Sequence, residues 1–165
     1  MIMSVSWVMN AQETRYYDAS KLTVIGKAIP TSKDFTRIDT SAYRFNDSVI
    51  EEYACHSTGL AVLFATDSPF IKARWQTSGK NASGNMTAIA QKGLDLYIRQ
   101  NGEWVFAGVG RPMMSKGPEY ASHASTIVKS MAPGRKECLL YLPLYDRLDS
   151  LFIGVDDKSY IEPID

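Results

Sequence analysis

Alternating hydrophobic and polar positions are clearest just before a short turn near residue 101. Leu94, Leu96 and Ile98 alternate with polar side chains, so an extended chain here has one apolar and one polar face. The turn is Asn101-Gly102, and a second strand-like run follows at residues 104–109. Asn-Gly is typical of two-residue hairpin turns because both residues adopt positive φ readily. The pattern predicts a β-hairpin with one face in the core.

Two more runs lie on either side of the turn sequence Asp67-Ser68-Pro69. Residues 60–66 are almost all apolar, as in a strand that is covered on both faces. Residues 70–76 alternate, with Ala73 and Trp75 on one side and Arg74 on the other. We expect these two runs to pair as a second hairpin.

Shorter apolar runs predict the remaining strands. They comprise residues 22–27, 49–55, 125–131, 138–142 and 151–155. Residues 77–84 are expected to form a loop, and residues 85–91 a short helical turn or irregular chain. Turn residues separate the runs, and no sustained period of 3.6 residues occurs. The sequence therefore predicts an all-β fold, an antiparallel β-sandwich.

The composition is that of one globular domain. The chain has 165 residues, of which 45% are hydrophobic and 22% charged, which suffices for a core without disulfides or metals. Eighteen basic residues balance eighteen acidic ones, so no net charge would attract nucleic acid or an anionic membrane. We expect no nucleic-acid partner.

The few cysteines and histidines argue against a metal site. Cys55 and Cys138 lie in apolar runs and are expected to be two buried thiols, although the sequence alone leaves a disulfide open. His56 and His123 have no second ligand at helical or turn spacing. A zinc site is not expected, nor is any other cofactor.

The N-terminal residues 1–12 are apolar and contain no Lys or Arg. They could be the end of a secretory signal cleaved after Ala11, which would place the protein in the periplasm or outside the cell, or a packed or irregular segment. A cytoplasmic location also stays open. The segment is too short to span a bilayer. The expected organisation is this segment over residues 1–15, a sandwich over 16–160 and the start of a linker over 161–165.

Motifs for nucleophilic catalysis are missing from the sequence. It contains neither Gly-x-Ser-x-Gly nor Gly-Asp-Ser, and neither histidine follows an aspartate by three positions. Gly79-Lys80 lacks the flanking Gly and Ser or Thr of a phosphate-binding loop. We therefore expect no catalytic residue in this chain.

Two polar residues and several aromatic ones are candidates for contact with a partner. Asp95 and Tyr97 share the polar face of the central run, where they could meet a ligand, or Asp95 could be a solvated or structural carboxylate. Trp75, Trp104, Tyr141 and Tyr145 could each stack on a sugar. Most aromatic residues in a sandwich are buried, so we expect Trp75 and Trp104 in the core.

Several blocks resemble one family in the family's order, over about residues 16–160. They are Ser57-Thr58-Gly59-Leu60, Phe64-Ala65-Thr66-Asp67-Ser68, residues 71–75, Asn85-Met86-Thr87-Ala88, Gly93-Leu94-Asp95-Leu96-Tyr97, residues 137–146 with Tyr141-Leu142-Pro143-Leu144-Tyr145-Asp146, and Ile153-Gly154-Val155. The family is the GxDLY-type N-terminal domain that precedes the catalytic domain in bacterial SGNH- or GDSL-type esterases. Its most specific motifs here are Gly-x-Asp-Leu-Tyr and Tyr-Leu-Pro-Leu-Tyr.

The resemblance implies a jelly-roll-like β-sandwich attached to an α/β hydrolase domain that carries the serine nucleophile, the oxyanion residues and an Asp-x-x-His pair. None of those blocks occurs in this sequence. The expected function is that of a non-catalytic accessory domain, which packs on a C-terminal SGNH hydrolase domain and helps shape its cleft for a carbohydrate ester or a related substrate. The contact surface is expected to include Asn85 and Met86, or Asp95 and Tyr97.

Two other functions stay open. The sandwich fold and the many tyrosines also suit a free-standing carbohydrate-binding module. A complete esterase with a site that the motifs do not reveal is the third possibility.

Overall fold

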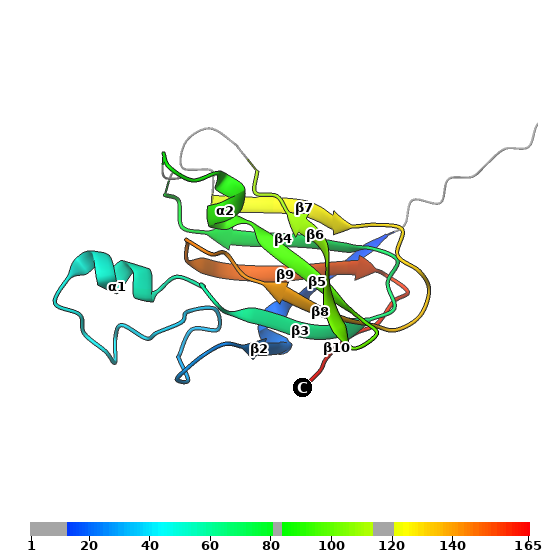
Figure 1. Ribbon diagram of the computed structural model, residues 1–165, viewed down its shortest axis with the longest axis horizontal. Helices are drawn as coiled ribbons and strands as arrows, with labels where there is room; N and C mark the ends of the chain where they lie inside the picture. The colour runs from blue at the N-terminus through cyan, green and yellow to red at the C-terminus, as the bar shows by residue number, and fades with distance from the viewer. Residues whose placement is uncertain (1–12, 81–83, 114–120) are drawn as a thin grey trace, which may run out of the picture.

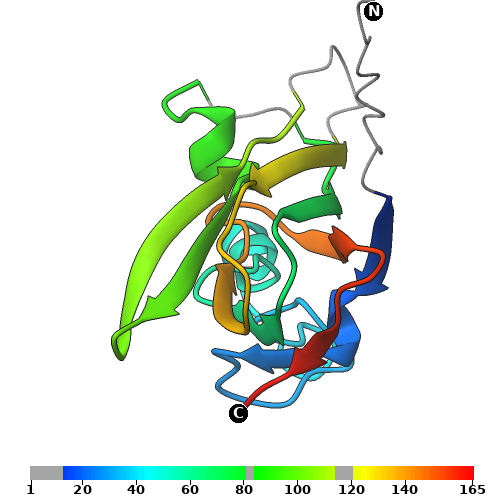
Figure 2. The ribbon, with the colours of Figure 1, turned by 90° about the vertical axis from the view of Figure 1, so that its right-hand side faces the viewer.

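Two antiparallel β-sheets packed face to face form the molecule (Figures 1 and 2). The computed structural model describes residues 13–80, 84–113 and 121–165. All strand pairs among these residues are antiparallel, which confirms the predicted all-β sandwich. The finer expectation of a jelly roll stays a prediction.

Each sheet draws its strands from distant parts of the sequence. The four-stranded sheet has the order β1 (Thr14–Asp18), β9 (Leu148–Asp156), β4 (Ile71–Thr77) and β7 (Ser122–Val128). The six-stranded sheet has the order β10 (Ile161–Pro163), β3 (Ala61–Thr66), β8 (Lys136–Tyr141), β5 (Leu94–Gln100) and β6 (Glu103–Gly110), and β2 (Thr23–Ile25) also pairs with β3. Three short helices complete the described chain: η1 (Ala19–Lys21), α1 (Ser48–Ala54) and α2 (Ala88–Lys92).

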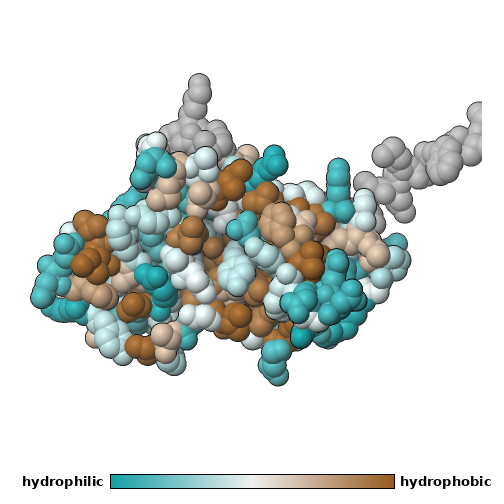
Figure 3. Space-filling model, viewed as in Figure 1, coloured by the Kyte–Doolittle hydropathy of each residue, from teal (hydrophilic) through white to brown (hydrophobic). Residues whose placement is uncertain are grey.

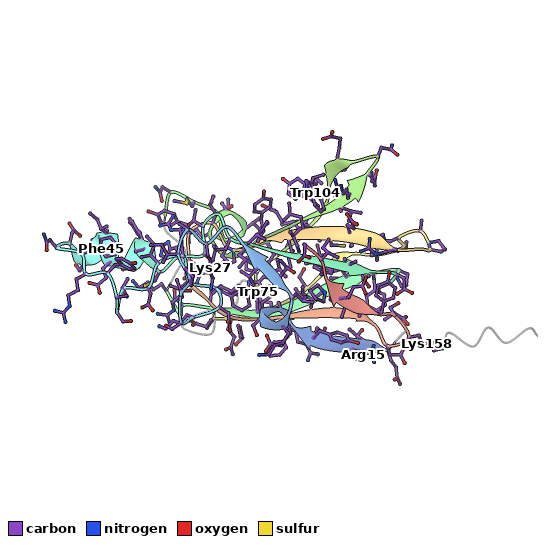
Figure 4. All side chains as sticks on the ribbon, turned by 90° about the horizontal axis from the view of Figure 1, so that it is seen from below. Arg15, Lys27, Phe45, Trp75, Trp104 and Lys158 are labelled. Atoms are coloured by element: carbon purple, nitrogen blue, oxygen red, sulfur yellow. The ribbon has the colours of Figure 1, made fainter. Side chains whose placement is uncertain are left out.

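The core lies between the sheets and is made by the inward side chains of both. Phe64 and Leu140 come from the six-stranded sheet, and Trp75 and Ile153 from the four-stranded sheet. Trp75 is 1% exposed and lies between the layers, so its predicted place in the core is confirmed (Figure 4).

The hairpin predicted around Asn101-Gly102 is β5–β6. Asn101 has φ 51° and Gly102 φ 89°, the positive values that this turn requires. The hairpin projects beyond the body of the sandwich (Figures 2 and 4). Trp104 pairs with Arg99 on its outward side and is 37% exposed. The expectation that Trp104 is a core residue is therefore wrong, because no second sheet of the described chain covers that side.

The second predicted hairpin, residues 60–66 with 70–76, is also wrong. Both runs are strands, but β3 pairs with β8, β2 and β10, whereas β4 pairs with β7 and β9. The turn between them carries the chain from one sheet to the other. Ser68 holds this crossing, since its hydroxyl donates to the Phe70 carbonyl at 2.6 Å and accepts from the Asp156 N–H at 3.0 Å.

Residues 49–55 were expected to form a strand, and this prediction is wrong. All but Cys55, which is the C-cap, belong to α1, and this helix lies at one end of the sandwich without a neighbouring strand (Figure 1). The Asp47 carboxylate caps the helix by accepting the N–H groups of Val49 at 2.7 Å and Ile50 at 3.3 Å. Only Ala54 of the helix is buried, so these residues pack on no sheet face that would stabilise an extended conformation.

Strands extend slightly past the expected boundaries of the sandwich. β1 begins at Thr14 and β10 ends at Pro163. The possible signal segment, residues 1–12, lies outside the described residues. Cys55 and Cys138 are both free, as expected, although Cys55 is half-buried and only Cys138 is fully buried. Among the described residues, no helix is both long and apolar enough to cross a membrane.

Candidate functional site

The Gly93-Leu94-Asp95-Leu96-Tyr97 motif joins α2 to β5. The Gly93 N–H donates to the Ile89 carbonyl at 3.0 Å, and a side chain at Gly93 would collide with that carbonyl oxygen. Leu94 and Leu96 point inward and are fully buried. Asp95 is exposed and Tyr97 half-buried on the opposite side of the strand. The glycine and leucines thus have structural roles, and the two remaining side chains are presented outward.

Outward side chains of the six-stranded sheet line up in rows because its strands pair in register. One row runs from β2 to β6 through Ile25, Ala61, Tyr141, Asp95 and Val109. The next runs through Thr23, Leu63, Leu139, Tyr97 and Phe106. These two rows are called the outer face below.

Apolar side chains dominate the outer face, which is partly open to solvent, since Ala61 and Leu139 are buried whereas others are exposed. Phe106 is 56% exposed and Tyr141 41%. The Tyr97 ring lies edge-on between them, with its centroid 5.7 Å from each. Hydrophobic side chains are visible here over the β5–β6 hairpin (Figure 3). Single exposed apolar residues are ordinary, but a contiguous group of this kind marks an interaction surface.

A chain of charges borders the outer face. Glu137 accepts from Arg135 at 2.7 Å and from Arg99 at 3.3 Å, and Arg135 also approaches Glu162 at 3.5 Å. The hydrogen bond from Arg135 is the main cause that lowers the pKa of Glu137 below its ordinary value. Exposed pairs add little to stability, so this border is better suited to orienting a charged partner.

Asp95 has no such partner. Among the described residues, no hydrogen bond or ion pair engages its carboxylate, which lies in a row between Tyr141 and Val109. The side chain therefore has no visible role within this fold. It is free to accept a cation or an N–H group from a partner.

The other two predicted contact residues lie elsewhere. Asn85 is exposed and Met86 half-buried, just before Thr87, whose hydroxyl caps α2. They are at the end of the sandwich where β5 begins, whereas Asp95 and Tyr97 are on the outer face. The structure thus places the four predicted residues at two different surfaces.

A buried ion pair holds this end of the sandwich together. Lys92 and Asp146 are 2.9 Å apart, with side chains 3% and 6% exposed. The Lys92 ammonium also donates to the Ser78 carbonyl at 2.9 Å, and the Asp146 carboxylate accepts the Arg147 N–H at 2.7 Å. The pair joins α2, the end of β4 and the segment before β9.

His123 lies next to this pair. Its Nδ1 accepts the Met113 N–H at 3.2 Å, so the ring proton belongs on Nε2, which is 3.1 Å from the Thr77 hydroxyl. Burial, with a smaller contribution from Lys92, lowers the pKa of His123 to about 4. The ring is therefore neutral at neutral pH.

His56, Ser78 and Asp146 line one hollow of about 310 Å³ next to α1. A catalytic triad requires hydrogen bonds from the serine to the histidine and from the histidine to the carboxylate. Within the described residues neither bond is present, and the Asp146 carboxylate is held by Lys92 and backbone N–H groups. The same residues contain no group of three or more His, Cys, Asp or Glu side chains that could hold a metal ion. The described residues thus form neither a triad of His56, Ser78 and Asp146 nor a metal-binding cluster.

Sequence reasoning did not single out Phe106, Lys92 or Asp146 as site residues. Lys92 directly precedes the Gly-x-Asp-Leu-Tyr block, and Asp146 ends the Tyr-Leu-Pro-Leu-Tyr-Asp block. Because Lys92 and Asp146 each adjoin or end one of the two distinctive family blocks, their positions could have indicated that the two residues interact. Phe106 gave no such signal, because its place beside Tyr97 depends on the register shift in the hairpin.

Comparison with known proteins identifies relatives of this fold. The family model described as GxDLY, the N-terminus of SGNH-hydrolase-type esterases, matches residues 14–161. A protein described as a GDSL-like lipase from Bacteroides ovatus is 42% identical with a TM-score of 0.86; the match covers 93% of this chain and 44% of that one. No curated protein matches.

A second solved structure shares the fold alone. It is a salicylyl-acyltransferase from a tetracycline biosynthetic pathway, 18% identical with a TM-score of 0.60, and the match covers 94% of this chain and 43% of that one. This chain spans less than half the length of either protein.

The family match covers nearly all of the two-sheet sandwich, including the motif at Gly93-Leu94-Asp95-Leu96-Tyr97. The 42% identity to the Bacteroides ovatus protein holds over a match that covers 93% of this chain. The chain belongs to the GxDLY family, the N-terminal domain of SGNH-hydrolase-type esterases.

Proposed function

We propose that this chain is a non-catalytic accessory domain that docks through its outer face on a C-terminal SGNH hydrolase domain and helps shape the substrate cleft there. The observation that carries the proposal is the contiguous apolar outer face, with Phe106, Tyr97 and Tyr141 around the unpaired Asp95. A free domain gains nothing from exposing such a surface, whereas a docked one buries it.

The relatives support a partner in the same chain. More than half of the Bacteroides ovatus protein lies outside the match, and the family description places this domain at the N-terminus of esterases. β10 pairs with β3 at one edge of the six-stranded sheet, and Glu162 pairs there with Ala65. β10 and β6 are the two opposite edges of this sheet, so a domain that follows β10 would have to extend across the outer face to reach Phe106.

In this proposal the hydrolase domain supplies the nucleophile, and the accessory domain contributes its outer face as a docking surface and as part of the cleft wall. The unpaired Asp95 carboxylate meets a cationic or N–H group of the partner, and the aromatic rings meet apolar side chains. The substrate is a carboxylic ester held between the two domains.

Matched aspartate substitutions on the two sheets test the proposal in the two-domain polypeptide. Phe106→Asp alters the outer face, whereas Phe152→Asp alters the opposite sheet, where Phe152 is similarly exposed at 41%. We expect Phe106→Asp to split thermal unfolding into two separate transitions and to raise KM for an aryl acetate ester. Phe152→Asp should leave both properties unchanged.

Both variants of the 165-residue chain alone should fold as the unmodified chain does, since neither phenylalanine is in the core. Equal behaviour of the two variants in the two-domain polypeptide would reject the outer face as the docking surface. A gene that does not encode an SGNH domain after Asp165 would reject the partner itself.

A further inference from the structure

A buried amide without a partner lies at the α1 and α2 end of the sandwich. Gln91 is 3% exposed, and no described residue forms a hydrogen bond with its Nε2. Buried donors are almost always paired, because an unpaired one loses its hydration without compensation. Gln91 lines a narrow hollow of about 110 Å³, so a bound molecule there could supply the missing acceptor.

The narrow hollow adjoins the wider one of about 310 Å³ next to α1. Glu52, His56, Ser78, Lys80 and Asp146 line both of them. The two together are called the end hollow here. Its size and its mixture of polar and aromatic lining suit one small ring with several hydroxyl groups.

Three aromatic rings form one wall of the end hollow. The centroids of Tyr53, His56 and Tyr145 lie 5.2 to 5.3 Å from one another. Burial is the main cause that lowers the pKa of His56, so this ring is neutral at neutral pH. Such a wall offers apolar contact to the C–H groups of a ring-shaped ligand, and the neutral His56 ring adds no charge to it.

The charges around the narrow part are internally balanced. Glu52 is paired with Lys80, and Asp146 with Lys92. The wider part is also lined by Glu51 and by Arg147, which is paired with Asp149, so it adds no excess of either charge. A neutral ligand that exchanges hydrogen bonds with amide, hydroxyl and paired charged groups fits this balance better than a charged one.

We propose that the end hollow binds a single neutral sugar residue, with the Gln91 amide donating to one of its oxygens and the aromatic wall contacting its ring. This site is separate from the outer face, and the inference stands whether or not that face docks a hydrolase domain.

Titration of the 165-residue chain, followed by NMR of backbone and side-chain amides, tests the inference. The probes are D-galactose, D-xylose and N-acetyl-D-glucosamine, with D-glucuronate as the anionic comparison. We expect at least one neutral sugar to shift the Gln91 side-chain amide signals in a saturable way, and D-glucuronate to bind more weakly.

Gln91→Met keeps the volume of the side chain and removes its amide. We expect it to weaken sugar binding about tenfold. Its Tm should be unchanged or higher, because an unpaired buried donor is removed. Gln76→Met, at an exposed glutamine of the four-stranded sheet, is the matched control and should bind as the unmodified chain does. Tyr53→Leu provides a second test, because it removes one ring from the wall and should also weaken binding.

Three results would overturn the inference. The first is an absence of saturable shifts with every neutral sugar. The second is binding that both Gln91→Met and Tyr53→Leu leave unchanged. The third is tighter binding of D-glucuronate than of any neutral sugar, which would assign the hollow to an anion.

Discussion

At the scale of single residues, the Lys92–Asp146 pair is the contact whose loss should matter most. Lys92→Met leaves the Asp146 carboxylate buried without its counter-charge, which typically costs 3–5 kcal/mol. Backbone N–H groups still donate to that carboxylate, so we expect the low end, about 3 kcal/mol. Urea denaturation followed by circular dichroism measures the loss.

Lys80→Met is the matched control for this prediction. Lys80 also pairs with a carboxylate, Glu52, but its side chain is 63% exposed. Exposed pairs contribute roughly 0–1 kcal/mol, so the free energy of unfolding should change by less than about 1 kcal/mol. Similar losses in the two variants would show that burial does not determine the strength of the Lys92 pair.

His123 makes stability depend on pH. Its pKa is lowered to about 4 in the folded state, so the unfolded chain binds more protons between that value and about 6.5. The contribution is present above the unfolded pKa and is lost as the pH falls toward the folded one. From about pH 7 to about pH 5, we expect the free energy of unfolding to fall by about 2 kcal/mol. His56, whose pKa is also lowered, acts in the same direction.

His123→Gln isolates this contribution. Glutamine can still reach the Thr77 hydroxyl but does not titrate. Urea denaturation of both proteins at the two pH values should therefore give a smaller pH dependence for the variant. If both proteins lose equal stability on acidification, the proton is taken up elsewhere in the molecule.

At the scale of elements, the junction of α2 and β5 depends on Gly93. A methyl group at this position would collide with the Ile89 carbonyl oxygen, so Gly93→Ala must displace either the helix end or the strand. We expect a loss of about 2 kcal/mol or more in the free energy of unfolding. Gly84→Ala, where a side chain meets nothing within 4 Å, should be nearly neutral. Equal effects would show that the junction can relax.

Elements with local signals were the ones that the sequence predicted correctly. The β5–β6 hairpin follows from alternation and from one Asn-Gly turn, and β3 from a continuous apolar run. By contrast, the partner of β3 is set by contacts with β8, more than 60 residues away along the chain. The sequence did not predict α1, because a short apolar run interrupted by the adjacent Glu51 and Glu52 is compatible with either a strand or a helix until its neighbours are known.

The same distinction applies to the candidate site. Asp95 and Tyr97 were predicted to share a polar strand face, and the structure places both outward. Their neighbours Tyr141 and Phe106 follow from strand order and from a register shift, which local pattern does not encode. The motif could therefore be recognised from the sequence, whereas the residues that surround it on the surface could be identified only from the structure.

At the scale of the whole molecule, Cys138 can report whether the two sheets separate as one unit. Its side chain is completely buried between them, and burial raises the pKa of its thiol to about 12. A thiol-specific reagent can therefore reach Cys138 only after the core opens. The half-buried Cys55 would react earlier, so the measurement uses the Cys55→Ser variant.

Labelling rates give the free energy of the opening that exposes Cys138. If the sheets open together, this free energy should decrease with urea concentration as steeply as the free energy of global unfolding. The physical reason is that β8, which carries Cys138, lies in the interior of the six-stranded sheet between β3 and β5. Exposing the thiol then requires the core between the layers to be lost. Labelling that is independent of urea would instead reveal local opening at β8, and the sandwich would not unfold as a single cooperative body.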